Sequence, residues 1–340
     1  IIRAIVDILR EDLGGPGTPG RYRALYFPAG QYKVTMPIPI PPRTIFLGEG
    51  IADPAQGDTI AASGIISDFS GADFIQSGSQ RTPYAFVTVG ADFLTEPNVT
   101  DTTTIFQNAD LQCGTTGNLP TDLFFANLSF KATNYESTFG GIQMFRMSRA
   151  NRVAFENCRF QAEYVCDAGA NSNPIGTALD QLADAQTFHI SGWSNIPEIQ
   201  PKDFYFNHCQ FQNFHRAFAP VNTVTNVTIT NSVFTDMFLP ISLGEDEFFS
   251  WSGSPPYIDP CTPVGQPTAW RVQNCRFDRI NSHAIAVYTQ YDPTSSTGVG
   301  HTFFNNKYEQ VGNDCVPYSP QTDPQVPAVY FADGTAHNQS

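Results

Sequence analysis

The chain has 340 residues, of which 41% are hydrophobic and only 15% charged, so it can bury a sizeable core and lacks the charge density of a disordered chain. Its 26 glycines and 26 prolines indicate many turns, and with 13% aromatic residues they favour a β-rich protein. The net charge of −14 repels phosphate backbones and anionic lipid surfaces, so we do not expect nucleic acid as a partner. No apolar run approaches the roughly 20 residues that cross a bilayer, so we do not expect membrane insertion.

The first segment, 1–24, is predicted to be a cap and a lead-in. Residues 1–13 carry isoleucine, valine and leucine at near-helical spacing, which predicts a short amphipathic α-helix. Gly14, Gly15 and Pro16 end it. Such a helix suits the open end of a β-structure, where backbone groups would otherwise lack partners.

Strands are predicted next, in two blocks separated by a proline-rich bend. Residues 25–32 read LYFPAGQY, residues 41–44 form the bend, and residues 46–50 read FLGEG. Aromatic and branched residues bounded by Pro and Gly are typical of short strands with tight turns.

A short phrase then recurs along the chain, with a polar anchor, an apolar residue two positions before it and an aromatic residue three positions after it. The anchors are Asn127, Asn157, His208, Asn231, Asn274 and Asn305. Before the anchors, apolar residues mostly lie at positions four and two residues away. After an anchor, the inward positions are one and three residues away, as Cys158 and Phe160 show. Since strand side chains alternate between faces, the chain must bend at the anchor, and we expect the anchor residue in the left-handed region that Asn tolerates.

The shortest repeat, from His208 to Asn231, is about 23 residues, which fits one coil of a parallel β-helix. Stacked coils would align the anchors into a ladder of side-chain amides. The ladder predicts that Asn157 and Asn274 are buried, so that loss of either amide costs about 1–3 kcal/mol.

The same stacking places a column of cysteines beside the bend. We expect Cys158, Cys209 and Cys275 to face inward and to remain reduced.

A third apolar strand follows the aromatic position in several coils, and large insertions leave from its end. The predicted third strands are 164–165, 217–221, 239–243 and 284–288, and the insertions are 166–200, 244–268 and 289–300. We therefore expect one β-helix over 25–334, a tail over 335–340, and binding loops clustered on one side of the solenoid.

The opening strings, LYFPAGQY and FLGEG, together with the coil phrases, resemble the pectate-lyase-like superfamily of right-handed parallel β-helices. The resemblance implies an all-β fold, a single right-handed parallel β-helix with a short N-terminal capping α-helix. The superfamily includes polysaccharide lyases, glycoside hydrolases and bacteriophage tailspikes. The NTD, DD and GHG motifs of polygalacturonases are absent from this sequence, and no aspartate set for calcium aligns, so no metal or cofactor is expected.

Two acidic groups are candidates for chemistry. Asp278 and Glu309 each follow the aromatic position in adjacent coils, so their backbones should lie about 4.8 Å apart, and such a pair could flank a glycosidic bond. The alternative is a solvated charge ladder, neutralised by Arg276, Arg279 and Lys307.

The other group, Glu245, Asp246 and Glu247, opens an insertion rich in aromatic residues. Rings stack on the apolar faces of sugars and carboxylates accept hydrogen bonds from hydroxyls, so these three are candidate catalytic acids beside candidate glycan-binding residues, namely Trp193, Trp251, Tyr257, Tyr291 and Asp292. The alternative is that these rings pack within a loop or against a neighbouring subunit.

Three functions remain open. The first is a bacteriophage attachment protein, a tailspike or fibre that binds cell-surface polysaccharide beside other virion proteins. The resemblance to tailspikes implies that such a protein is a homotrimer. The second is a secreted or virion-borne polysaccharide-degrading enzyme, a glycoside hydrolase or lyase. The third is a structural module of a virion without catalysis.

Overall fold

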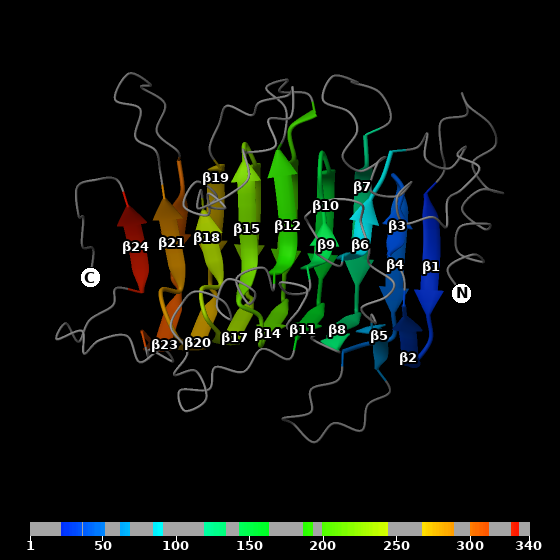
Figure 1. Ribbon diagram of the computed structural model, residues 1–340, viewed down its shortest axis with the longest axis horizontal. Coiled ribbons are helices and arrows are strands. Elements are labelled where there is room, and N and C mark those ends of the chain that lie inside the picture. The colour runs from blue at the N-terminus through cyan, green and yellow to red at the C-terminus, as the bar shows by residue number, and fades with distance from the viewer. Residues whose placement is uncertain are drawn as a thin grey trace, which may run out of the picture.

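The computed structural model describes residues 22–35, 37–51, 62–68, 84–90, 119–133, 143–162, 186–192, 199–243, 267–288, 300–312 and 328–332. In these residues the chain is built from β-strands that form three sheets of 8 strands each. Figure 1 shows the strands of successive coils side by side, with β1 and β24 at opposite ends of the long axis. The predicted capping helix, 1–13, and the tail, 335–340, lie outside the described residues, and of the predicted cap and lead-in, 1–24, the structure describes 22–24.

Each coil contributes one strand to each sheet, and all pairs between coils are parallel. Sheet A contains β1 (Arg23–Phe27), β4 (Thr44–Gly48), β7 (Thr121–Ala126), β10 (Asn151–Glu156), β13 (Lys202–Asn207), β16 (Thr225–Thr230), β19 (Thr268–Gln273) and β22 (Thr302–Phe304). Sheet B contains β2 (Gly30–Val34), β5 (Ser63–Asp68), β8 (Ser129–Thr133), β11 (Arg159–Gln161), β14 (Gln210–Gln212), β17 (Val233–Met237), β20 (Arg276–Ile280) and β23 (Lys307–Val311). Sheet C contains β3 (Ile38–Ile40), β6 (Tyr84–Thr88), β9 (Gln143–Arg146), β12 (Gln186–Gly192), β15 (Arg216–Asn222), β18 (Ile241–Leu243), β21 (Ile285–Tyr288) and β24 (Val329–Ala332). The architecture is therefore the right-handed parallel β-helix that the repeats and the resemblance predicted.

The bend between sheets A and B lies at the predicted anchors. The anchor residues have φ angles of 57° at Asn127, 50° at Asn157, 52° at His208, 50° at Asn231, 55° at Asn274 and 52° at Asn305. All six are in the left-handed region, which confirms the prediction drawn from the shift in apolar spacing. Because each anchor turns the chain in the same way, successive coils superpose and their strands stay in register.

Phenylalanine ladders fill the core, one behind each sheet. Phe125 and Phe155 stack at 4.4 Å between ring centroids behind sheet A, Phe211 and Phe234 at 4.7 Å behind sheet B. Behind sheet C, Phe145 stacks on Phe188 at 5.0 Å. These separations match the spacing of paired strands, so each of these coils adds one ring to the column behind its sheet. In later coils Ile229 and Val272 continue the column of sheet A, and Ile241 and Ile285 that of sheet C. Rings of different ladders meet edge to face, which packs the triangular interior.

The cysteine column is as predicted: Cys158, Cys209 and Cys275 are buried free thiols. The Cys158 Sγ donates to the Phe125 carbonyl of the preceding coil at 3.6 Å, and the Cys209 Sγ donates to the Phe155 carbonyl at the same distance. Burial raises the pKa of Cys209 to about 12 and that of Cys275 to about 11. These thiols therefore act as small core residues with a weak donor.

Two predictions need correction. The range 166–200 is not one insertion, because β12 (Gln186–Gly192) lies within it and forms the third strand of its coil, in place of residues 164–165. The anchor amides are not buried: Asn157 is half-buried and Asn274 is exposed. At the bend the left-handed backbone turns the anchor side chain toward solvent, and the column beneath it, which contains Cys158, fills the interior instead.

Candidate functional site

The loops predicted to bind glycan begin at one edge of sheet C. β12 ends at Gly192, β18 at Leu243 and β21 at Tyr288, and in each case the chain goes on to the sheet A strand of the next coil. Only β15 separates β12 from β18, and β18 pairs with β21. The strand ends before the three segments are thus close neighbours at the carboxyl edge of this sheet.

The predicted residues on those segments lie outside the described residues. They are Trp193, Glu245, Asp246, Glu247, Trp251, Tyr257, Tyr291 and Asp292. Trp193 directly follows Gly192, so its attachment point is at the same edge as those of the other two segments. The segment 163–185 starts elsewhere, between sheets B and C. The placement of these side chains remains a prediction.

The rival acidic pair is described in full. Asp278 of β20 and Glu309 of β23 are register partners on the outer face of sheet B, as the spacing predicted. Arg276 joins them: its Nη2 donates to Asp278 Oδ2 at 3.0 Å and its Nε donates to Glu309 Oε2 at 2.6 Å. Lys307 Nζ lies 2.5 Å from Glu309 Oε1, and Arg279 Nη1 donates to Asp278 Oδ2 at 2.9 Å.

The charges around this pair favour the charge ladder over acid–base chemistry. Hydrogen bonds from Lys307 and then from Arg276 lower the pKa of Glu309, whereas a general acid at neutral pH needs a raised one. The ladder continues along the sheet, because Arg279 also binds Asp236 through two bonds, of 2.6 Å and 2.8 Å. These paired charges bridge neighbouring coils on the outer face.

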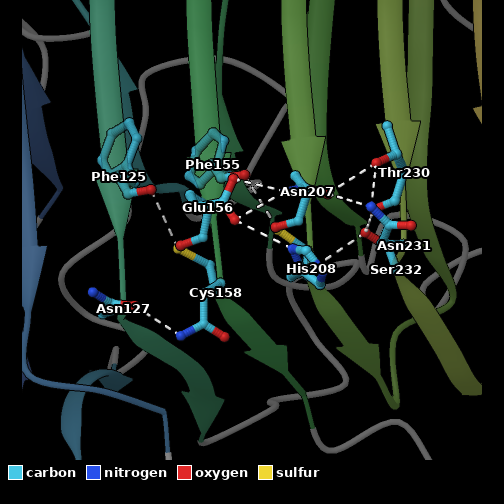
Figure 2. A network of polar contacts seen from close by, with 12 residues as sticks. Phe125, Asn127, Phe155, Glu156, Cys158, Asn207, His208, Thr230, Asn231 and Ser232 are labelled. Carbon is cyan, nitrogen blue, oxygen red and sulfur yellow. Dashed lines mark hydrogen bonds and ion pairs between the residues drawn. The ribbon is translucent and has the colours of Figure 1, made fainter.

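A second polar network lies at the bend between sheets A and B. Glu156 accepts two hydrogen bonds from Asn207 Nδ2, at 2.9 Å and 3.0 Å, and its Oε1 lies 3.3 Å from His208 Nδ1. Asn207 Oδ1 in turn accepts from Thr230 Oγ1 and from Asn231 Nδ2, both at 2.8 Å. Figure 2 shows these side chains converging across three successive coils.

Sequence reasoning treated His208 as a substitute in the amide ladder and did not single out Glu156. The ladder is regular at both ends, where Asn157 Nδ2 donates to Asn127 Oδ1 and Asn305 Nδ2 donates to Asn274 Oδ1, each at 2.7 Å. At His208 it is interrupted, and the contacts between coils pass to the residues just before the anchors. The sequence did contain a signal: a carboxylate, Glu156, directly before one anchor, and a histidine in place of asparagine at the anchor of the next coil.

An exposed ring lies on the same outer face of sheet A. Phe204 and Phe206 of β13 are buried, so Tyr205 between them faces outward, and it is 42% exposed. Its register partners are Ala154 of β10 and Thr228 of β16, both small side chains. Tyr205 therefore stands above its neighbours on this face.

In the described part of the chain, no group of three or more His, Cys, Asp or Glu side chains is placed to hold a metal ion. Within the same ranges, no helix has the length and apolarity that crossing a bilayer demands.

Solved structures similar to this chain are parallel β-helix proteins. The surface adhesin PfbA of Streptococcus pneumoniae is 12% identical, with 97% of this chain and 73% of that chain covered and a TM-score of 0.41. ORF18 of Geobacillus virus E2 is also 12% identical, covering 97% of this chain and 57% of that one, with a TM-score of 0.38. The endo-xylogalacturonan hydrolase of Aspergillus tubingensis is 10% identical, with 97% and 79% covered and a TM-score of 0.40.

At such identities and TM-scores the likeness concerns the fold and transfers no activity. No protein-family model and no curated protein matches the chain.

Proposed function

We propose that this β-helix is a glycan-binding protein, and more specifically a bacteriophage attachment protein, a tailspike or fibre that binds cell-surface polysaccharide as a homotrimer among other virion proteins. One observation carries the proposal. The segments with Trp193, Glu245–Glu247 and Tyr291 begin at neighbouring strand ends on one edge of sheet C. A polysaccharide chain is bound by rings for stacking and by carboxylates for hydroxyl recognition, and these segments carry both residue types.

Binding is favoured over hydrolysis in the described part of the chain. The carboxylates of Asp278 and Glu309 are each held by cationic side chains, and hydrogen bonds from Lys307 and Arg276 lower the pKa of Glu309, which is the opposite of what a general acid requires. If the proposed loop site also cleaves the glycan, the acid within it is Glu245, Asp246 or Glu247. The proposal places the virion or the cell exterior as the location of the protein.

The experiment is a binding screen of the full chain against bacterial surface polysaccharides, repeated with Trp251→Ala and with Tyr22→Ala. Hiding one ring against a sugar is worth on the order of 1–2 kcal/mol, so Trp251→Ala should weaken binding about tenfold. Tyr22, another exposed aromatic residue, precedes β1 in the first coil, so its loss should leave affinity unchanged. The absence of binding to every polysaccharide, or equal effects of both variants, contradicts the proposal.

Two further measurements test the finer claims. Light scattering on the purified chain should give three times the 37.4 kDa chain mass if it is a homotrimer. Release of new reducing ends from a bound polysaccharide, abolished by neutralising one residue of Glu245–Glu247, would instead identify a degrading enzyme.

A further inference from the structure

At the bend between sheets A and B, five of the six described anchors are asparagine, and His208 is the one that is not. Asn and His both tolerate the left-handed backbone, so the histidine fits the φ angle of 52°. It does not supply the amide that extends the ladder, and Glu156 and Asn207 carry the contacts there. A local break in an otherwise repeated pattern is expected where function, rather than stability, selects the residues.

The Glu156 carboxylate keeps acceptor capacity at this break. A carboxylate offers about four lone-pair sites, and the described contacts are the two bonds from Asn207 and the approach of His208. The Glu156 side chain is 38% exposed and that of His208 is 59% exposed. Asn207 and His208 therefore hold the carboxylate in one orientation while part of it still faces solvent.

Tyr205 is on the same face as this carboxylate and next to it. Tyr205 and Asn207 alternate with buried phenylalanines on β13, so they lie about 7 Å apart along one face, the span of a sugar residue. Glu156 is the register partner of Asn207, and Ala154 is that of Tyr205. Beside the ring, Ala154 therefore contributes only a methyl group, two residues before Glu156 on the same strand.

We propose that Tyr205, Glu156, Asn207 and His208 form a binding subsite for a neutral pyranose on the outer face of sheet A, separate from the loops at sheet C. The ring stacks on the apolar face of the sugar, and the oriented carboxylate accepts hydrogen bonds from its hydroxyls. A neutral sugar fits better than a uronic acid, because Glu156 and the net charge of −14 repel an added carboxylate. The subsite rests on the proposed function only in that its ligand is a glycan.

The test is fluorine NMR of the full chain labelled with 3-fluorotyrosine. The Tyr205 resonance is assigned as the one lost in Tyr205→Phe, and it is followed during titration with maltohexaose, cellohexaose, mannohexaose and hexagalacturonate. The expected result is a saturable shift of this resonance with at least one neutral probe and none with hexagalacturonate. No shift with any of the neutral probes overturns the inference.

Affinity for the neutral probe that binds is then measured by calorimetry with three variants. Tyr205→Ala should bind about tenfold more weakly, whereas Tyr205→Phe should retain most of the affinity because the ring remains. Tyr26→Ala is the matched control, since Tyr26 is exposed on the same sheet but donates its hydroxyl to Glu49 at 2.5 Å. Equal losses in Tyr205→Ala and Tyr26→Ala overturn the subsite.

The experiments distinguish failure of the proposed function from failure of the subsite. If Trp251→Ala alone weakens polysaccharide binding and the Tyr205 resonance does not respond, the proposed function stands and the subsite is wrong. If the Tyr205 resonance responds and Trp251→Ala has no effect, the subsite stands and the assignment of binding to the loops is wrong.

Discussion

The amide ladder can be tested by separating its two contributions at Asn157. This residue has φ of 50° and donates from Nδ2 to Asn127 Oδ1 at 2.7 Å. The left-handed region costs an ordinary residue with a Cβ, such as alanine, about 1–2 kcal/mol, a cost that glycine avoids and asparagine tolerates best among the other residues. One hydrogen bond contributes about 0.5–1.5 kcal/mol. The half-buried position of Asn157 places its hydrogen bond near the lower end of that range.

We therefore expect Asn157→Gly to lower the free energy of unfolding by about 0.5–1 kcal/mol and Asn157→Ala to lower it by about 1.5–2.5 kcal/mol. The measurement is urea denaturation of the full chain followed by circular dichroism and tryptophan fluorescence. The glycine variant is the matched control, because it loses the same hydrogen bond but keeps the backbone unstrained. If Asn157→Ala is as stable as Asn157→Gly, the left-handed backbone does not account for the choice of asparagine.

Two other predictions concern the core thiols and the charge ladder. Cys209 is buried and its pKa is raised to about 12, so it should not react with a maleimide at pH 8 in the native protein but should react in urea. Mass spectrometry measures the labelling, and rapid labelling of the native protein would contradict the buried column of cysteines. Glu309 has a pKa lowered by Lys307 and Arg276, so its contribution is present above its ordinary value of 4.5 and is lost as the pH falls through the folded value. Glu309→Gln should therefore be less stable than wild type at pH 7 in low salt, and the difference should vanish in acid and shrink in high salt; a difference independent of pH would contradict the ion pairs.

The sequence predicted the bend between sheets A and B because the same bend recurs there with the same residue types at the same positions. Other left-handed positions escaped notice. One column includes Asp122, Arg152 and Ala269, and another includes Asp236 and Arg279. These residues share no side-chain type, because the contacts between neighbouring coils differ along each column: Arg152 pairs with Asp122, whereas Asn226 donates to Asp203. No column of like residues therefore marks these positions in the sequence.

The third strand of one coil was misplaced for a related reason. β12 pairs with β15 over six residues, from Gln186 with Arg216 to Gly192 with Asn222, but a long segment separates it from β11. Its inward residues, Phe188 and Ile190, alternate as a strand requires. Loop length costs little once the coil is formed, so distance along the chain was a poor guide to which apolar pair completes the coil.

The departure of His208 from the ladder leads to a last prediction, that His208→Asn makes the protein more stable and a weaker glycan binder. Asparagine suits the φ of 52°, and its amide would lie between those of Asn157 and Asn231, so regained bonds should add about 0.5–1 kcal/mol to the free energy of unfolding. The same change removes the contact of His208 Nδ1 with Glu156 and leaves Asn207 alone to orient the carboxylate, so the shift of the Tyr205 resonance should saturate only at higher sugar concentration. Denaturation in urea and the fluorine titration measure the two effects on one sample. Lower stability would show that the ladder does not extend through this position, and unchanged sugar binding would show that His208 does not orient Glu156 for a ligand.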